Sequence, residues 1–155
     1  MVSDNVKRLK CSDCLDILLA SYKSRENEIE PSALRSLISC IGEILVAQEL
    51  SPELWESGLV KRSFALILST SMYESGKVRR CAQDIIFQIM ELHFNSNFSM
   101  SSRHLVRQLD ILNKEFNEDD YHDVVNYLMM VARVMLVVHN DFYPNLIQLL
   151  LKVCL

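Results

Sequence analysis

The residues with the greatest potential for chemistry are five cysteines and four histidines. Cys11 and Cys14 have the Cys-x-x-Cys spacing of half a zinc site, but no second Cys-x-x-Cys or His-x-x-x-His pair follows. The number of cysteines is odd, and most of them have apolar neighbours, which is typical of free buried thiols. We therefore predict structural thiols and no metal site at these positions.

A second candidate metal site is His122 with its acidic neighbours, Asp119, Asp120 and Asp123. Acids at the start of a helix more often interact with the positive end of the helix dipole, so we predict no metal here either. The sequence contains no Gly-rich phosphate loop, nucleophile elbow or His-Glu-x-x-His motif. We predict a protein that is not an enzyme and that uses no cofactor and no small-molecule substrate.

The basic residues cluster more clearly than the other ionisable groups. Six of them are candidate contacts for RNA or a protein partner: Lys61, Arg62, Lys77, Arg80, Arg103 and Arg107. Stacked helices could gather them along one edge as a patch for phosphates. The net charge of −4 argues against a domain that wraps nucleic acid over its whole surface. The alternative for the six basic residues is that they are ordinary solvated surface residues.

Length and composition predict one α-helical domain. A chain of 155 residues can bury a substantial core, and half of its residues are hydrophobic. Three glycines and three prolines are too few for the frequent turns of a many-stranded β fold. No apolar run reaches the roughly 18 residues of a membrane span. The first ten residues lack the apolar core of a signal peptide, which favours a reducing intracellular compartment.

The helix predicted over 75–94 is the element that organises the others. At about 100° per residue, one broad apolar face contains Val78, Cys81, Ala82, Ile85, Ile86, Ile89 and Leu92. A second apolar strip contains Phe87, Met90 and Phe94. A helix that is apolar on most sides lies between other helices. We assign structural roles to Val78, Arg79, Ala82 and Gln83, and we expect Arg79 to extend along the surface or to pair with an acid of the next repeat.

Six further helices are predicted around it, over about 4–22, 32–48, 52–73, 101–116, 121–138 and 141–155. We expect caps at 51–53 and 118–120, a bend near Ser57, and close approach of a neighbouring helix at Gly42. Inward positions include Cys14, Leu15, Ile17, Leu18, Leu34, Ile38, Phe64, Ile67, Val131 and Val134. Trp55 is either packed or an exposed anchor for a partner, and burial statistics favour packing.

The helices form pairs that repeat along the chain. Leu59-Val-Lys-Arg and Leu105-Val-Arg-Gln are 46 residues apart, within the period of about 40–47 that HEAT and armadillo repeats have. We predict a HEAT/armadillo-like α-solenoid of about three antiparallel helix pairs plus a final helix, with a compact helical bundle as the alternative. The final helix carries Leu146, Leu149, Leu150, Val153 and Leu155, and we expect it to support self-association.

Four markers follow one another in this order: Leu34-x-x-Leu-Ile-x-x-Ile-Gly-Glu-Ile-Leu, Trp55, Leu66-Ile-Leu and Lys77-Val-Arg-Arg-Cys-Ala-Gln83. Together they resemble the HEAT-repeat region of the ribosomal-RNA-processing protein twelve family, over about residues 32–155. Because proteins of that family are many times longer, the resemblance implies that the single HEAT-repeat domain over 1–155 is a fragment of a longer solenoid.

The resemblance also implies a function. It indicates a non-enzymatic scaffold in ribosome biogenesis, acting in pre-ribosomal RNA processing, small-subunit maturation and pre-ribosome export. The implied partners are pre-ribosomal particles, with their RNA and assembly proteins, and the implied location is the nucleus and nucleolus with shuttling to the cytoplasm. One alternative is a HEAT scaffold of another pathway, such as nuclear transport or a phosphatase or chromosome complex. A second alternative is a helical regulatory bundle, with zinc held by Cys11, Cys14 and a further ligand.

Overall fold

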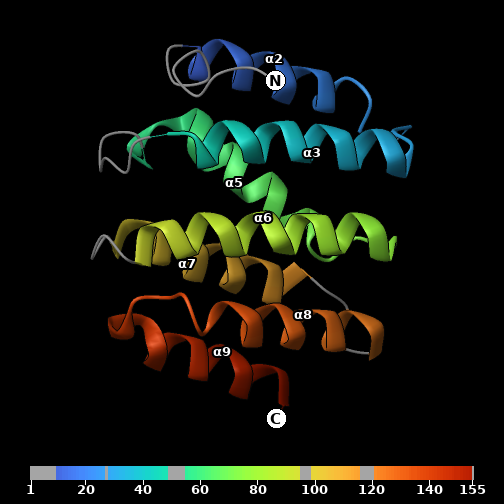
Figure 1. Ribbon diagram of the computed structural model, residues 1–155. Coiled ribbons are helices and arrows are strands. Elements are labelled where there is room, and N and C mark those ends of the chain that lie inside the picture. The colour runs from blue at the N-terminus through green and yellow to red at the C-terminus, as the bar shows by residue number, and fades with distance from the viewer. Residues whose placement is uncertain (1–9, 27, 49–54, 95–98, 116–120, 155) are drawn as a thin grey trace. The chain divides into compact units, whose positions relative to one another are not determined.

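The computed structural model describes residues 10–26, 28–48, 55–94, 99–115 and 121–154 (Figure 1). Within these ranges the chain forms seven α-helices and no strand, which confirms the all-α prediction. The helices are α2 (Cys11–Lys23), α3 (Pro31–Val46), α5 (Gly58–Thr70), α6 (Gly76–Phe94), α7 (Ser99–Glu115), α8 (Tyr121–Val134) and α9 (Tyr143–Cys154), with a 3-10 turn, η1 (Asn140–Phe142), before α9. None of these helices is long and apolar enough to cross a membrane.

The chain divides into two compact units, 1–89 and 90–155, and the division falls inside α6. In the first unit α2 packs on α3 and α5, and α3 also packs on α5. Figure 1 shows α3 and α6 running in the same direction, with α5 behind them and antiparallel to α6. This arrangement of antiparallel pairs, in which the second helices of successive pairs are parallel, is the one expected for stacked helical repeats.

Burial along α6 follows the predicted apolar face. Val78, Ala82 and Ile86 are at most 1% exposed, as expected for a helix that is apolar on most sides. Leu92 was expected to be inward but is 43% exposed. Leu92 lies one helical turn beyond Gln88, the last residue of α6 that lines a groove shared with α3.

The inward stripe of α2 differs from the prediction. Leu15, one of the positions expected to be inward, is buried together with Cys11, whereas Ile17, which was also expected to be inward, is 66% exposed. Leu15 and Ile17 are two residues apart and therefore point about 200° apart on a helix. Several apolar stripes are available on this short helix, and packing against α3 and α5 selects the one that contains Leu15.

Two features between α3 and α5 agree with the predictions. Trp55 is 3% exposed, and its ring packs edge-on against Phe64 with the centroids 5.3 Å apart, so it is a packed tryptophan. Trp55 and Glu56 are helical, and the helix is interrupted at Ser57, where a bend was expected. The predicted caps at 51–53 and 118–120 lie outside the described residues.

The second unit contains α7, α8, η1 and α9. Here α9 packs on α7 and α8, around a core that includes Leu105, Leu109 and Tyr127. The prediction for the helix over 121–138 was too long, because α8 ends at Val134 and residues 135–137 form a turn. Tertiary contacts fix this ending, since the backbone N–H of His139 donates to Ser102 Oγ at 3.0 Å. No Gly or Pro marks the position in the sequence.

The outward face of α9 also differs from the expected one. Leu146 and Leu149 are buried, Leu150 and Val153 are half-buried, and Leu155 lies outside the described residues. The exposed apolar side chains of α9 are Ile147 and Leu151, with 48% and 51% of their surface accessible.

Candidate functional site

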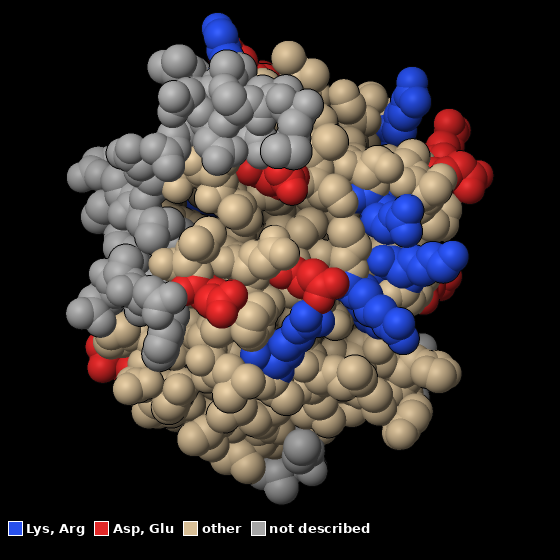
Figure 2. Space-filling model, viewed as in Figure 1, with Lys and Arg blue, Asp and Glu red and all other residues tan. Residues whose placement is uncertain are grey.

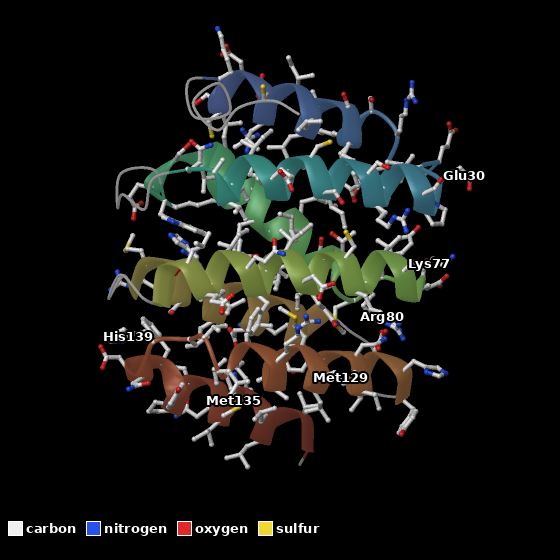
Figure 3. All side chains as sticks on the ribbon, viewed as in Figure 1. Glu30, Lys77, Arg80, Met129, Met135 and His139 are labelled. Atoms are coloured by element: carbon white, nitrogen blue, oxygen red, sulfur yellow. The ribbon has the colours of Figure 1, made fainter. Side chains whose placement is uncertain are left out.

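A groove of about 480 Å³ lies between α3 and α6. Basic side chains line one end of it, and acidic side chains lie further along. Arg35 of α3 with Lys77 and Arg80 of α6 form its basic end. Figure 3 shows Lys77 and Arg80 near the start of α6, at the same side of the unit as Glu30, which precedes α3. Lys and Arg side chains also gather on that side of the surface in Figure 2. We call this feature the α3–α6 groove.

The middle of the α3–α6 groove is narrow because small residues bring the two helices together. Ser39 Oγ lies 3.2 Å from Cys81 Sγ. One turn further along, a Cβ atom at Gly42 would lie 2.6 Å from Ile85 Cγ2, so only glycine fits beside this isoleucine without a shift. Close approach of a neighbouring helix at Gly42 was predicted and is confirmed. These contacts fix the alignment of α3 with α6.

The electrostatics of the α3–α6 groove favour a negative group at its basic end. Arg35, Lys77 and Arg80 form no ion pair within 4.0 Å with any residue of the described ranges. The helix dipoles of α3 and α6 add positive potential at the same end, because both helices begin there. Further along the groove lie two acids, Glu43 and Asp84.

A second groove, of about 380 Å³, lies between α7 and α9. Arg103 and Arg107 line it from α7, and Phe142, Asn145, Gln148 and Lys152 line it from the other wall. We call it the α7–α9 groove. Neither arginine forms an ion pair with another described residue, so both are available to an anionic ligand.

Asp110 closes one side of the α7–α9 groove and joins its two helices. Its carboxylate accepts from Lys114 Nζ at 2.6 Å and from Lys152 Nζ at 2.9 Å. Hydrogen bonds from these two ammonium groups lower the pKa of Asp110 below its ordinary value. The acid is therefore ionised and paired, and the positive charge of the two arginines is not cancelled by it.

The structure describes the six predicted contact residues within their own units. Lys77 and Arg80 lie in the α3–α6 groove, and Arg103 and Arg107 lie in the α7–α9 groove. Lys61 instead pairs with Glu56 at 2.7 Å. Arg62 lines a separate cavity between α2 and α5, together with Asp16 and Glu26, and its Nε donates to the Gly58 carbonyl oxygen.

Several groove residues were missed in the sequence. Arg35 could have been found, because it stands 42 residues before Lys77 at the equivalent place in the preceding repeat. Phe142, Asn145 and Gln148 carry no such signal. They face Arg103 and Arg107 only because the turn after α8 directs α9 back along α7.

The four residues assigned structural roles surround the turn between α5 and α6. Val78 and Ala82 are buried, and Gln83 Nε2 donates to the Ser71 carbonyl oxygen at 3.3 Å. Arg79 was expected either to extend along the surface or to pair with an acid of the next repeat, and within the described residues it forms no such pair. Its guanidinium donates to the carbonyl oxygens of Tyr73 and Glu74, at 2.9 and 3.2 Å, which lie in the link between α5 and α6 and outside any helix.

The residues considered for metal binding form no cluster in the described part of the chain. No group of three or more His, Cys, Asp or Glu side chains is placed there to hold an ion. Cys11 is buried, and burial raises the pKa of its thiol. The nearby Cys14 raises this pKa further. His122 is exposed, while Asp119 and Asp120 lie outside the described residues.

Comparison with known families gives one match. The model for "RRP12-like, N-terminal HEAT repeats" matches residues 1–117 of the 155 residues. The match therefore includes residues 1–31, which lie outside the expected resemblance over about 32–155, and it ends before α8. Neither the comparison with curated proteins nor the comparison with solved structures found a match.

Proposed function

Because the chain belongs to the family of RRP12-like N-terminal HEAT repeats, we propose that it is a non-enzymatic scaffold in ribosome biogenesis. It acts in pre-ribosomal RNA processing, small-subunit maturation and export of pre-ribosomes. Its partners are pre-ribosomal particles, and it works in the nucleus and nucleolus with passage to the cytoplasm. The family match over 1–117 carries this proposal.

A scaffold of this kind needs surfaces that bind macromolecules, and the α7–α9 groove suits single-stranded RNA. Arg103 and Arg107 can pair with successive phosphates, and the half-buried Phe142 offers an aromatic face for a base. Asn145 and Gln148 add amide donors and acceptors beside it. Stacking on one aromatic ring tolerates any base, so the contact recognises unpaired RNA rather than a fixed sequence.

The test uses the full-length parent protein in cells. We expect the parent to co-purify with precursors of ribosomal RNA and with assembly factors, and to lie in the nucleolus. Depletion should cause precursors of the small-subunit RNA to accumulate, and the intact parent should restore processing. A parent that captures import, phosphatase or chromosome complexes without ribosomal RNA precursors would overturn the proposal in favour of another HEAT scaffold.

A further inference from the structure

The α3–α6 groove is not needed for the RNA contact just described, and its lining suits a different ligand. We propose that it binds a short peptide segment of a protein partner, with an acidic side chain at the basic end and an uncharged stretch along the rest of the groove. This proposal goes beyond the scaffold function and does not depend on it. It rests on the order of charges along two parallel helices.

The basic end can hold a carboxylate from both walls. Arg35 comes from α3, Lys77 and Arg80 come from α6, and all three side chains are exposed without an ion pair among the described residues. Guanidinium groups bind carboxylates with two parallel hydrogen bonds, and such charge-assisted bonds are stronger than neutral ones. Because the cations belong to two helices that Gly42 holds in close contact, their spacing is set before a ligand arrives.

The rest of the groove sets the length and character of the segment. Arg35 and Val46 both line it, eleven residues apart on α3, which corresponds to about 16 Å at roughly 1.5 Å per residue. An extended peptide covers that distance with about five residues. Beyond the basic end the wall contains Gly42, Val46 and Ile85, which suit a small apolar side chain.

The acids of the groove distinguish a peptide from a nucleic acid. Glu43 and Asp84 follow the basic end by about two turns on α3 and about one turn on α6. A strand of RNA would carry further phosphates past these carboxylates, and like charges at an interface repel one another. A peptide needs only one or two carboxylates at the basic end and can be neutral where the acids lie.

Cys81 provides a direct measure of occupancy. It is half-buried in the middle of the groove, beside Ser39, so a bound peptide will cover its sulfur. Cys40 lies on α3 outside the groove and is exposed. Alkylation of both thiols with iodoacetamide, followed by mass spectrometry, therefore reports protection at Cys81 with Cys40 as the control in the same molecule.

The experiment uses the 155-residue chain and three probes: an acetylated, amidated peptide Asp-Asp-Gly-Leu-Ser-Gly, the same peptide with Asn-Asn in place of Asp-Asp, and a ten-nucleotide oligouridylate. We expect the acidic peptide to slow alkylation of Cys81 about three-fold or more at saturation, with no change at Cys40. The double variant Lys77→Ala/Arg80→Ala should weaken peptide binding about ten-fold, because it removes two charge-assisted hydrogen-bonding partners. Arg62→Ala, a cation outside this groove, should leave binding unchanged.

Three results would overturn the proposal. The first is that the asparagine peptide protects Cys81 as strongly as the acidic peptide does. The second is that the oligouridylate protects Cys81 more strongly than the acidic peptide. The third is that none of the three probes protects Cys81. Circular dichroism and thermal melting of each variant show whether it is folded. Since both side chains of the double variant are exposed, its melting temperature should equal that of the wild type.

Discussion

Gly42 of α3 faces Ile85 of α6 so closely that a Cβ atom at position 42 would lie 2.6 Å from Ile85 Cγ2. The two residues are 43 positions apart, and the neighbouring contact between Ser39 and Cys81 has a separation of 42. Both separations fall within the period of about 40–47 residues of HEAT and armadillo repeats. The contact thus joins equivalent positions of consecutive repeats and holds the α3–α6 groove in shape.

Replacing this glycine should destabilise the first unit. We expect Gly42→Ala to lower the free energy of unfolding by about 1–2 kcal/mol, because overpacking outweighs the gain of about 1 kcal/mol in helix propensity. Gly58→Ala is the matched control, since in the described part of the structure a Cβ atom there meets nothing within 4 Å. Urea unfolding of the three proteins measures the difference.

The cause can be tested by shortening the opposite side chain. If the contact with Ile85 is responsible, Gly42→Ala/Ile85→Ala should lose less stability than the sum of its single changes. Strict additivity of the two changes would show that the loss at position 42 has another origin.

Ala82 should tolerate no large side chain. It is fully buried on the crowded face of α6, so Ala82→Arg would bury a long cation at a cost of about 3 kcal/mol or more. Gln88→Arg places the same side chain at an exposed position of the same helix and should change stability by no more than about 0.5 kcal/mol. Equal urea midpoints for the two variants would contradict the central position of α6.

Tyr127 links α8 to α7 and makes the second unit sensitive to alkaline pH. The side chain is fully buried, and its hydroxyl donates to the Leu109 carbonyl oxygen at 3.1 Å. Burial raises the pKa of Tyr127, and the Asp110 carboxylate raises it further. A raised pKa means that the folded state keeps the phenol neutral. Its contribution to stability is complete below the unfolded pKa of about 10 and is lost as the pH rises above it.

We therefore expect the free energy of unfolding to fall above about pH 10, and this fall to be shallower in Tyr127→Phe. At neutral pH the same variant should be less stable by about 1 kcal/mol, because it loses the hydrogen bond. Absorbance at 295 nm should show one of the five tyrosines ionising only as the chain unfolds. An identical pH profile for the variant would exclude Tyr127 as the source.

Much of the fold could be predicted because the apolar periodicity is strong and the helices recur in pairs. The buried face of α6 and the packing at Gly42 follow from local patterns. The end of α8 at Val134 could not be predicted, since a hydrogen bond between His139 and Ser102, which are 37 residues apart, fixes the turn. The exposure of Ile17 also depends on tertiary packing, which selects one of several apolar stripes.

The candidate site could be predicted only in part. Basic residues are visible in a sequence, but their partners across a groove depend on the alignment of two helices. Arg35 joins Lys77 because α3 and α6 are offset by one repeat. Arg79 was recognised as structural, yet its hydrogen bonds to backbone carbonyl groups have no signature in the sequence.

The RNA contact predicted for the α7–α9 groove should appear in the salt dependence of binding. We expect Arg103→Ala/Arg107→Ala to weaken binding of a single-stranded oligouridylate, because two phosphates no longer pair with an arginine. The plot of log K against log salt should become shallower by about 1.4 for the same reason. Lys61→Ala/Arg62→Ala, on α5, is the control and should leave the slope unchanged. Fluorescence anisotropy at several salt concentrations measures both, and an unchanged slope in the first variant would make its arginines ordinary surface residues.

The last prediction concerns self-association through α9. Ile147 and Leu151 are one helical turn apart, and about half of each side chain is exposed, so they form an apolar strip that water solvates poorly. We expect two copies of the chain to cover it by pairing, which makes the apparent mass rise with concentration. Ile147→Glu/Leu151→Glu should abolish that rise and keep the helix content, because neither residue is buried within its own unit. Gln148→Glu, an exposed change on the same helix, controls for added charge. Sedimentation velocity over a hundred-fold range of concentration decides the question: a wild-type chain that remains monomeric throughout would show that this strip is not a contact between copies.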